Sequence, residues 1–272
     1  MNKYIRFAAF FLVFVLIGTG TLRATTLRID SPKVKLKVSP GQTVSGAIVV
    51  ENLSDIAVPI RAYFEDFKYI SPFDGSKEFL PQASTSFSCA PWISFSPQEF
   101  TLRPLEKRQV YYSINVPEEA SGGYYSVLFF ESALGPGRDE EGRAVSVIGR
   151  IGSLFFVETQ DSIKAADISG INASLRDLHG TIANTGTTII IVKPVFYIMD
   201  QAGLVVDRGK PPELFLNPGD QTNFSIGLSS DLAQGRYIAV LTFDLEGQDV
   251  VIREVTFSKD SFGAVEILDV KE

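Results

Sequence analysis

The chain has very few of the residues that build catalytic and metal centres. It contains one cysteine, Cys89, and one histidine, His179, among 272 residues. A single cysteine excludes an intramolecular disulfide, and a single histidine leaves almost no material for a Ser-His-Asp triad or a zinc site. We expect Cys89 to be a small buried residue, with an intermolecular bridge as the alternative, and His179 to lie on the solvated side of a strand. We therefore predict no enzyme activity, no cofactor and no metal.

Long apolar runs are also scarce, and the one that exists stands at the N-terminus. Lys3 and Arg6 precede the apolar run from Phe7 to Ile17, and Ala24 offers a small residue for cleavage. This order is typical of a secretory signal peptide over residues 1–24, and the apolar run is shorter than the roughly 20 residues of a membrane-spanning helix. An uncleaved anchor is the alternative. We expect an exported protein, in the periplasm or at the cell surface, with no membrane span in the mature chain.

Basic residues are fewer than acidic ones. The chain has 25 Lys and Arg against 32 Asp and Glu, a formal net charge of −7, and removal of the three basic residues of the signal peptide takes it to −10. An acidic surface repels phosphate backbones and anionic lipid. We therefore expect no nucleic-acid partner.

Helical periodicity is absent from the mature chain. Instead, apolar and polar residues alternate with a period of two over residues 44–51, 58–65 and 110–116, and Gly, Pro, Asn and Asp separate these segments. This pattern is typical of antiparallel strands. The predicted fold class is all-β.

The same order of turn and strand signals occurs twice. Asn52 and Asn184 each open a turn that leads into an apolar strand, and Leu102 and Leu216 each precede a proline-containing turn before later strands. The first copy has about 20 more residues between its landmarks, which is more than a short connection needs. We infer an internal duplication with an insertion in the first copy.

Each copy has the size of one immunoglobulin-like sandwich, roughly 100 residues. We predict two tandem immunoglobulin-like β-sandwich domains after the signal peptide. The first covers residues 25–160 with the insertion at about 67–91, and the second covers 161–272 with a C-terminal tail. The boundary is expected near residues 158–163, and residues 262–270 are either an added edge strand or a frayed end.

One family resemblance concerns the first domain. Its segments Leu36–Thr43, Val50–Asp55, Trp92–Pro97 and Val116–Tyr125 resemble the N-terminal, peptidoglycan-binding-type domain of the WxL-interacting proteins of bacterial cell surfaces. The resemblance implies peptidoglycan binding by the first domain and a protein partner for the second. That family usually ends in a membrane-spanning segment and a basic tail, and this chain ends in polar sequence instead.

A second resemblance concerns the run Ile148–Phe156. It is similar to the last first-domain strand of two-domain periplasmic pilus chaperones, which implies that the strand is donated to a subunit of incomplete fold. The alternating apolar residues that suit this role are Val145, Val147, Ile151, Phe155 and Val157. The cationic residue with which such chaperones hold the subunit's carboxylate is missing where Gly152 and Ser153 stand. Lys35 or Lys37 would supply one half of that pair.

Candidate partner-binding residues come from these two regions. The insertion is rich in aromatic residues, of which Tyr69, Phe73 and Phe79 are the candidates, whereas Trp92 leads into a strand and is expected in the core. Val147 and Ile151 are the candidates on the donated strand. The charged segment Gly135–Gly142 is expected to be a loop that is either solvated or binds a cation through Asp139, Glu140 and Glu141.

These observations predict a non-enzymatic binding or scaffold module of the cell envelope. Its partner would be another surface protein or a wall glycan such as peptidoglycan. The alternative is a periplasmic chaperone that donates a strand to pilus-type or surface subunits.

Overall fold

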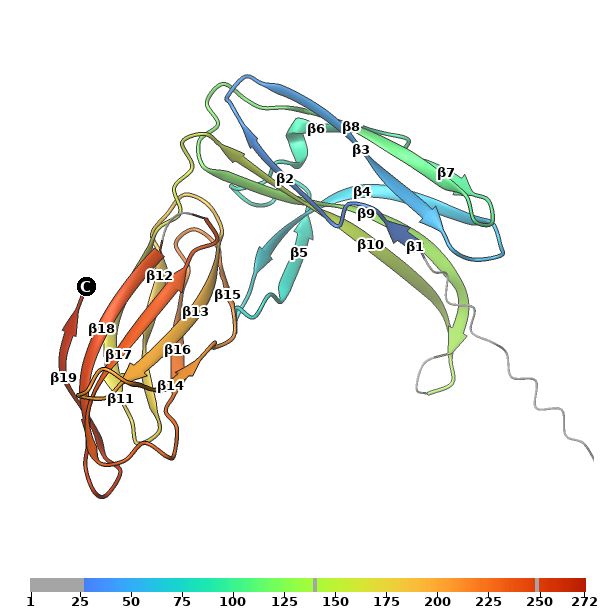
Figure 1. The fold of residues 1–272 in the computed structure, drawn as a ribbon. Coiled ribbons are helices and arrows are strands. Elements are labelled where there is room, and N and C mark those ends of the chain that lie inside the picture. The colour runs from blue at the N-terminus through green and yellow to red at the C-terminus, as the bar shows by residue number, and fades with distance from the viewer. Residues whose placement is uncertain (1–26, 139–140, 248–249) are drawn as a thin grey trace, which may run out of the picture.

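The computed structural model describes residues 27–138, 141–247 and 250–272. Within these ranges it consists of β-strands and one short 3-10 helix, Ala90–Trp92. Figure 1 shows two β-sandwiches that meet at an angle, with the N-terminal half of the chain in one and the C-terminal half in the other. The predicted fold class, two tandem immunoglobulin-like sandwiches, is confirmed, while the predicted signal peptide lies outside the described residues.

The first sandwich pairs a four-stranded sheet with a six-stranded one. The four-stranded sheet has the order β1 (Leu27–Ile29), β3 (Thr43–Asn52), β8 (Lys107–Asn115), β6 (Ile93–Ser96). The six-stranded sheet has the order β2 (Lys33–Val38), β10 (Ala144–Thr159), β9 (Gly123–Arg138), β4 (Val58–Tyr69), β5 (Lys77–Pro81), and β7 (Glu99–Leu102) also pairs with β4. Inward-facing residues of both sheets fill the core, as period-two patterning requires. Those with no exposed surface include Ile48, Ile114, Leu128, Phe130 and Phe155.

The second sandwich repeats this plan with a smaller first sheet. That sheet has the order β11 (Ala166–Ala173), β12 (Asp177–Asn184), β16 (Gln221–Gly227). The larger sheet has the order β14 (Val205–Gly209), β13 (Ile190–Met199), β17 (Gly235–Asp244), β18 (Val250–Lys259), β19 (Val265–Lys271), and β15 (Leu214–Leu216) also pairs with β13. The C-terminal tail is therefore an edge strand, β19.

The β9–β10 hairpin is the longest element of the molecule. Its pairing runs from Gly123 opposite Glu158 to Arg138 opposite Ala144. In Figure 1 it extends past the end of the first sandwich on the concave side of the molecule. The expectation of a loop over Gly135–Gly142 is therefore wrong for Gly135 to Arg138, which are paired strand residues. Glycine and proline suggested a turn there, but a projecting hairpin tolerates both because one edge needs no further partner. Asp139 and Glu140 lie outside the described residues.

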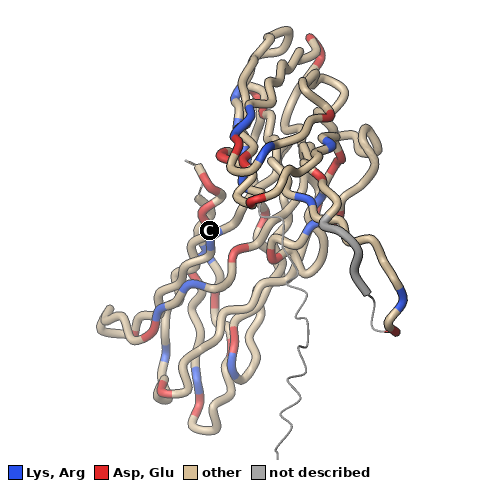
Figure 2. Tube along the Cα trace, turned by 90° about the vertical axis from the view of Figure 1, so that its right-hand side faces the viewer, with Lys and Arg blue, Asp and Glu red and all other residues tan. Residues whose placement is uncertain are grey.

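Charged residues are distributed over both sandwiches. Figure 2 shows Lys and Arg interspersed with Asp and Glu along most strands, so neither sandwich is uniformly of one sign. Among the described residues, no group of three His, Cys, Asp or Glu side chains is arranged to hold a metal ion. Within the same part of the chain, no helix has the length and hydropathy needed to cross a bilayer.

Candidate partner-binding edge and interdomain cleft

The N-terminal strand divides its pairing between the two sheets of the first sandwich. β1 pairs with β3 in one sheet, and β2 then pairs in parallel with β10 in the other, but only along Leu154–Thr159. The other half of β10, Ala144–Ser153, pairs with β9 on one side and with no strand of the described chain on the other. An unpaired strand edge presents backbone N–H and C=O groups that a strand from another chain can bind.

Apolar side chains accompany this open edge. Val145, Val147 and Ile151 lie on the same face of β10 as the core residues Phe155 and Val157, because residues two apart share a face. Ile151 is half-buried against the core and Val147 is half-buried, whereas Val145 is exposed. The apolar row thus continues outward from the core along the unpaired half of the strand.

The opposite face of β10 carries a cation held between aromatic rings. The Arg150 guanidinium lies 4.0 Å from the ring centroid of Phe129 and 5.2 Å from that of Phe79. The same guanidinium donates to Glu65 at 2.9 Å. Phe79, predicted as a partner contact, therefore lies on the outer face of the sheet with 38% of its surface exposed.

The structure explains why no cationic side chain stands at Gly152 and Ser153. A Cβ atom at Gly152 would lie 2.7 Å from Val127 Cγ2 and 2.9 Å from Phe129 Cε1, so a side chain there would collide with these two side chains of β9. Ser153 is fully buried, and its hydroxyl donates to the Ser31 carbonyl at 2.6 Å. Neither position has room for a lysine or arginine.

Two of the predicted aromatic contacts lie between the sandwiches instead of on the surface. Tyr69 is 2% exposed, its ring centroid is 5.0 Å from that of Phe215, and its backbone bonds to the Asn217 side chain in both directions. Phe73 is half-buried between the two sandwiches, and its carbonyl accepts from the Phe215 amide at 2.8 Å. The insertion therefore supports the second sandwich, and Tyr69 is not available to an external partner.

Further contacts hold the two sandwiches together. The hydroxyl of Tyr125 shares a hydrogen bond of 2.6 Å with Thr188 and accepts from the Ile189 amide. Burial is the main reason that the pKa of Tyr125 is raised. A small apolar cluster, with members from both sandwiches, surrounds this tyrosine and includes Phe67, Phe156 and Ile189.

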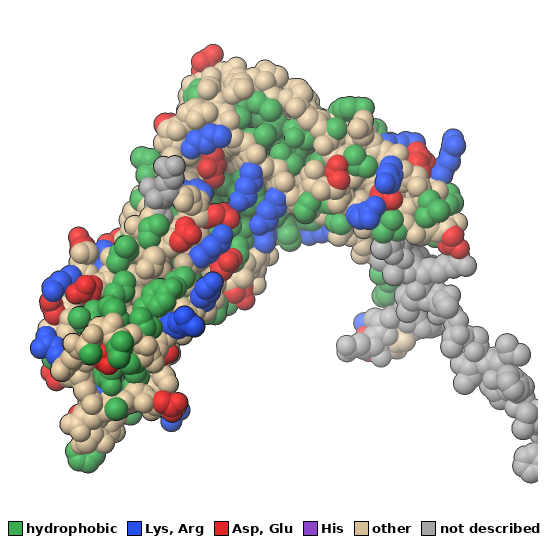
Figure 3. Space-filling view, viewed as in Figure 1, with side chains coloured by type: hydrophobic (Ala, Val, Ile, Leu, Met, Phe, Trp, Pro, Cys, Tyr) green, Lys and Arg blue, Asp and Glu red, His purple; other side chains and the backbone are tan. Residues whose placement is uncertain are grey.

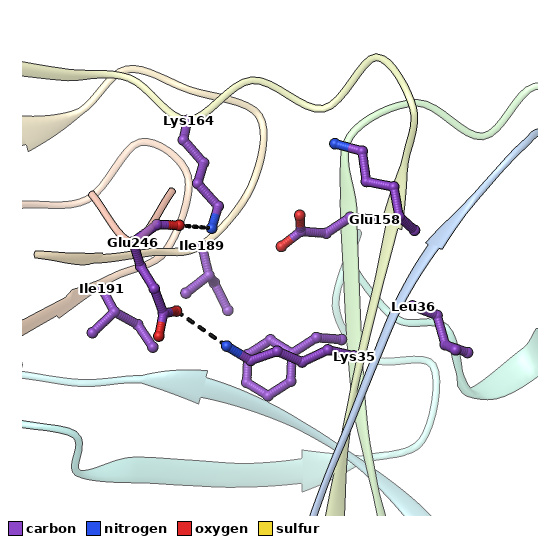
Figure 4. A pocket seen from close by; sticks show the side chains of 9 residues that line it. Lys35, Leu36, Glu158, Lys164, Ile189, Ile191 and Glu246 are labelled. Carbon is purple, nitrogen blue, oxygen red and sulfur yellow. Dashed lines mark hydrogen bonds and ion pairs between the residues drawn. The ribbon is translucent and has the colours of Figure 1, made fainter. Parts of the chain in front are cut away.

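A cleft of about 210 Å³ lies beside this interface. Its floor is apolar and its rim is charged; the lining residues are Lys35, Leu36, Lys37, Phe156, Glu158, Lys164, Ile189, Ile191 and Glu246. Figure 4 shows these side chains converging from both sandwiches. In Figure 3 basic side chains gather at the junction on the concave side of the molecule.

Glu246 is the centre of the charged rim. Its carboxylate lies 3.1 Å from Lys35 Nζ and 3.5 Å from Lys193 Nζ, and its backbone carbonyl accepts from Lys164 Nζ at 2.6 Å. Partial burial acts to raise the pKa of this carboxyl, but the Lys35 hydrogen bond and the three lysine charges outweigh it, so the pKa is lowered.

Of this cleft, the sequence had suggested only Lys35 and Lys37. The signal was the resemblance to pilus chaperones, which implied that one of these lysines supplies half of a cationic pair. Nothing in the local sequence around Glu246 or Lys164 indicated that they meet Lys35, since they are distant in the chain.

Comparisons with known proteins support the fold. No family model matches the chain, and a comparison with curated proteins found no significant match. The class 5 fimbriae chaperone CfaA is similar over 84% of this chain and 97% of that one, with 16% identity and a TM-score of 0.51. A chain from the chaperone–tip adhesin complex of CFA/I fimbriae biogenesis gives the same coverage and TM-score at 14% identity. At these identities the likeness shows the tandem-sandwich fold, and the resemblance to WxL-interacting proteins stays a prediction.

Proposed function

We propose that this protein is an exported, non-enzymatic assembly chaperone that binds a surface or pilus-type subunit by strand addition. The observation that carries the proposal is the unpaired edge Ala144–Ser153 with its apolar row. This was the alternative function that the sequence suggested, and the chaperone fold of the similar structures supports it over a wall-glycan scaffold.

The binding mode follows from the geometry of β10. A subunit strand added along Ala144–Ser153 would satisfy the backbone groups of the open edge. Val147 and Ile151 would then contribute apolar side chains to a partner whose own sandwich lacks a strand. Because β2 occupies the same edge from Leu154 onward, the added strand would have to end beside Lys33. A strand parallel to β10 would thus direct its carboxyl end toward the interdomain cleft.

The proposal is tested by substitutions on the two faces of the edge. The protein would be co-expressed with exported subunits encoded beside its gene, and complexes would be measured by size-exclusion chromatography with native mass spectrometry. We expect a one-to-one complex that Val147→Asp or Ile151→Asp abolishes, because a carboxylate cannot be buried in an apolar groove without a large penalty.

Ile148→Asp is the matched control. Ile148 is a neighbour of Val147 but lies on the opposite face of β10 with 58% of its surface exposed. We expect this variant to keep the complex. Loss of the complex in all three variants, or in none of them, would reject strand addition at this face.

A further inference from the structure

The outer face of the larger sheet of the second sandwich is apolar. Phe196 and Ile198 of β13 and Leu241 of β17 point into the core, so their neighbours along each strand point outward. Tyr197 and Ile252 on this side are 42% and 49% exposed. The outward apolar side chains lie on three adjacent strands, β13, β17 and β18, and form what we call the apolar face; they are Val195, Tyr197, Met199, Ile238, Val240 and Ile252. In Figure 3 apolar side chains gather on the second sandwich over these strands.

The smaller sheet of the same sandwich shows the ordinary pattern. Its outward side chains are polar, with His179 opposite Ser225 and Thr181 opposite Asn223. An antiparallel sheet that covers a core on one side commonly has such a polar, solvated face on the other. The apolar face departs from this pattern within one domain, and a contiguous exposed apolar patch marks an interaction site.

Charged residues of opposite sign flank the apolar face. Across the sheet, Arg208 of β14 lies opposite Tyr197, Tyr197 lies opposite Val240, and Val240 lies opposite Glu254 of β18. One row therefore runs from a cation over an aromatic and an aliphatic side chain to a carboxylate. Glu254 has Lys271 at 3.8 Å, but both side chains are largely exposed, so this pair is weak.

A shallow cleft lies at the basic end of this row. Its volume is about 300 Å³, and its lining residues are Val195, Phe196, Tyr197, Arg208, Gly209 and Lys210. The cleft thus combines apolar walls with two cations, and it would accept an acidic side chain that projects from an apolar surface.

We propose that the apolar face binds the same face of a second copy of this chain, across a two-fold axis that runs between β13 and β17. Such an axis places β13 over β17 of the other copy and β14 over β18 of the other copy. Tyr197 would then pack on Val240, and Arg208 would meet Glu254, each contact occurring twice. The acidic edge of each copy would enter the cleft at the basic edge of the other.

The order of the charges favours a second copy over another partner. A face that is basic at one edge, apolar in the middle and acidic at the other edge is complementary to itself after a two-fold rotation. Four strands about 4.8 Å apart and about seven residues long give a flat area of roughly 450 Å². A standard interface buries about 800 Å² on each partner, so we expect a weak, concentration-dependent dimer.

Sedimentation equilibrium over a concentration series measures the dimer. We expect the wild type to dimerise with a dissociation constant in the micromolar range. Arg208→Glu and Glu254→Arg should each raise this constant at least about tenfold, because each places like charges together at two symmetric contacts. The double variant Arg208→Glu with Glu254→Arg should return it to within about threefold of the wild-type value, because the opposite charges face each other again. Ile252→Lys should also weaken the dimer.

Tyr111→Lys is the matched control for Ile252→Lys. Tyr111 is likewise an exposed strand residue but belongs to β8 of the first sandwich, so this variant should dimerise as the wild type does. Thermal unfolding followed by circular dichroism shows that each variant is folded. A wild type that stays monomeric up to about 1 mM, a double variant as weak as the single ones, or equal effects of Ile252→Lys and Tyr111→Lys would each overturn the inference.

This inference goes beyond the proposed chaperone function and fails separately from it. The apolar face includes no residue of the open edge Ala144–Ser153, so Val147→Asp should leave the dimer unchanged while it abolishes the subunit complex. Ile252→Lys should weaken the dimer and keep the complex. A dimer lost in Val147→Asp but kept in Ile252→Lys would place self-association at the open edge and overturn the inference.

Discussion

At the scale of single residues, the two sandwiches share one feature, a buried asparagine at the start of a turn. Asn52 Nδ2 donates to the carbonyls of Ile56 and Arg103, and Asn184 Nδ2 donates to those of Thr188 and Leu216. In both copies the Oδ1 atom accepts from the amide two residues later, at 2.9 Å. Each side chain thus ties a turn to a distant strand end, which is why asparagine opens both copies of the repeat.

These hydrogen bonds predict that replacing one asparagine lowers the stability of the protein markedly. Asn184→Ala leaves buried carbonyls without a donor, so we expect the free energy of unfolding to fall by about 1–3 kcal/mol. Urea denaturation measures the change. Asn172→Ala, at an exposed position, is the control and should change stability by less than about 0.5 kcal/mol. Equal losses in the two variants would show that the buried hydrogen bonds of Asn184 contribute little.

At the scale of elements, β10 is paired differently at its two ends. Its last residues are paired on both sides, by β9 and β2, whereas its first half is open on one side. Between the two halves, Gly152 allows the ring of Phe129 to lie across the strand beneath Arg150. The glycine therefore shapes the outer face next to the open edge.

A side chain at this glycine should disturb the hairpin. Gly152→Val places a Cβ atom within 3.0 Å of Val127 and Phe129, and we expect a loss of about 1–3 kcal/mol from overpacking. Thermal unfolding followed by near-UV circular dichroism would report both the stability and the ring environment. Gly227→Val is the control, because a Cβ atom there meets nothing within 4 Å. A Gly152 variant as stable as the control would contradict the close approach.

At the scale of the whole molecule, the insertion connects the sandwiches. Tyr69 lies in that connection, and burial, with a smaller contribution from Glu246, raises its pKa to about 12 from an ordinary 10.0. The folded protein therefore keeps the proton of Tyr69 at a pH where the unfolded chain has lost it. The stabilisation is complete below pH 10 and is lost as the pH rises from about 10 to 12.

The corresponding prediction concerns alkaline unfolding. Tyr69→Phe has no hydroxyl to ionise, so its free energy of unfolding should decline less between pH 10 and 12 than that of the wild type. Some decline should remain, since burial also raises the pKa of Cys89 to about 12. Urea denaturation at several pH values measures the slope. A slope in Tyr69→Phe equal to that of the wild type would contradict the buried position of the Tyr69 hydroxyl.

The local sequence determined the alternating strands, the division into two sandwiches and the short supply of cysteine and histidine, because side-chain alternation and composition can be read from the chain itself. It also placed Val147 and Ile151 on one face of a strand. Whether that strand had a free edge depended on where β2 begins to pair with β10. Whether Tyr69 was a surface or an interface residue, and which lysines met Glu246, depended on how two separate sandwiches pack. Such contacts join residues far apart in sequence, so only the tertiary structure decided them.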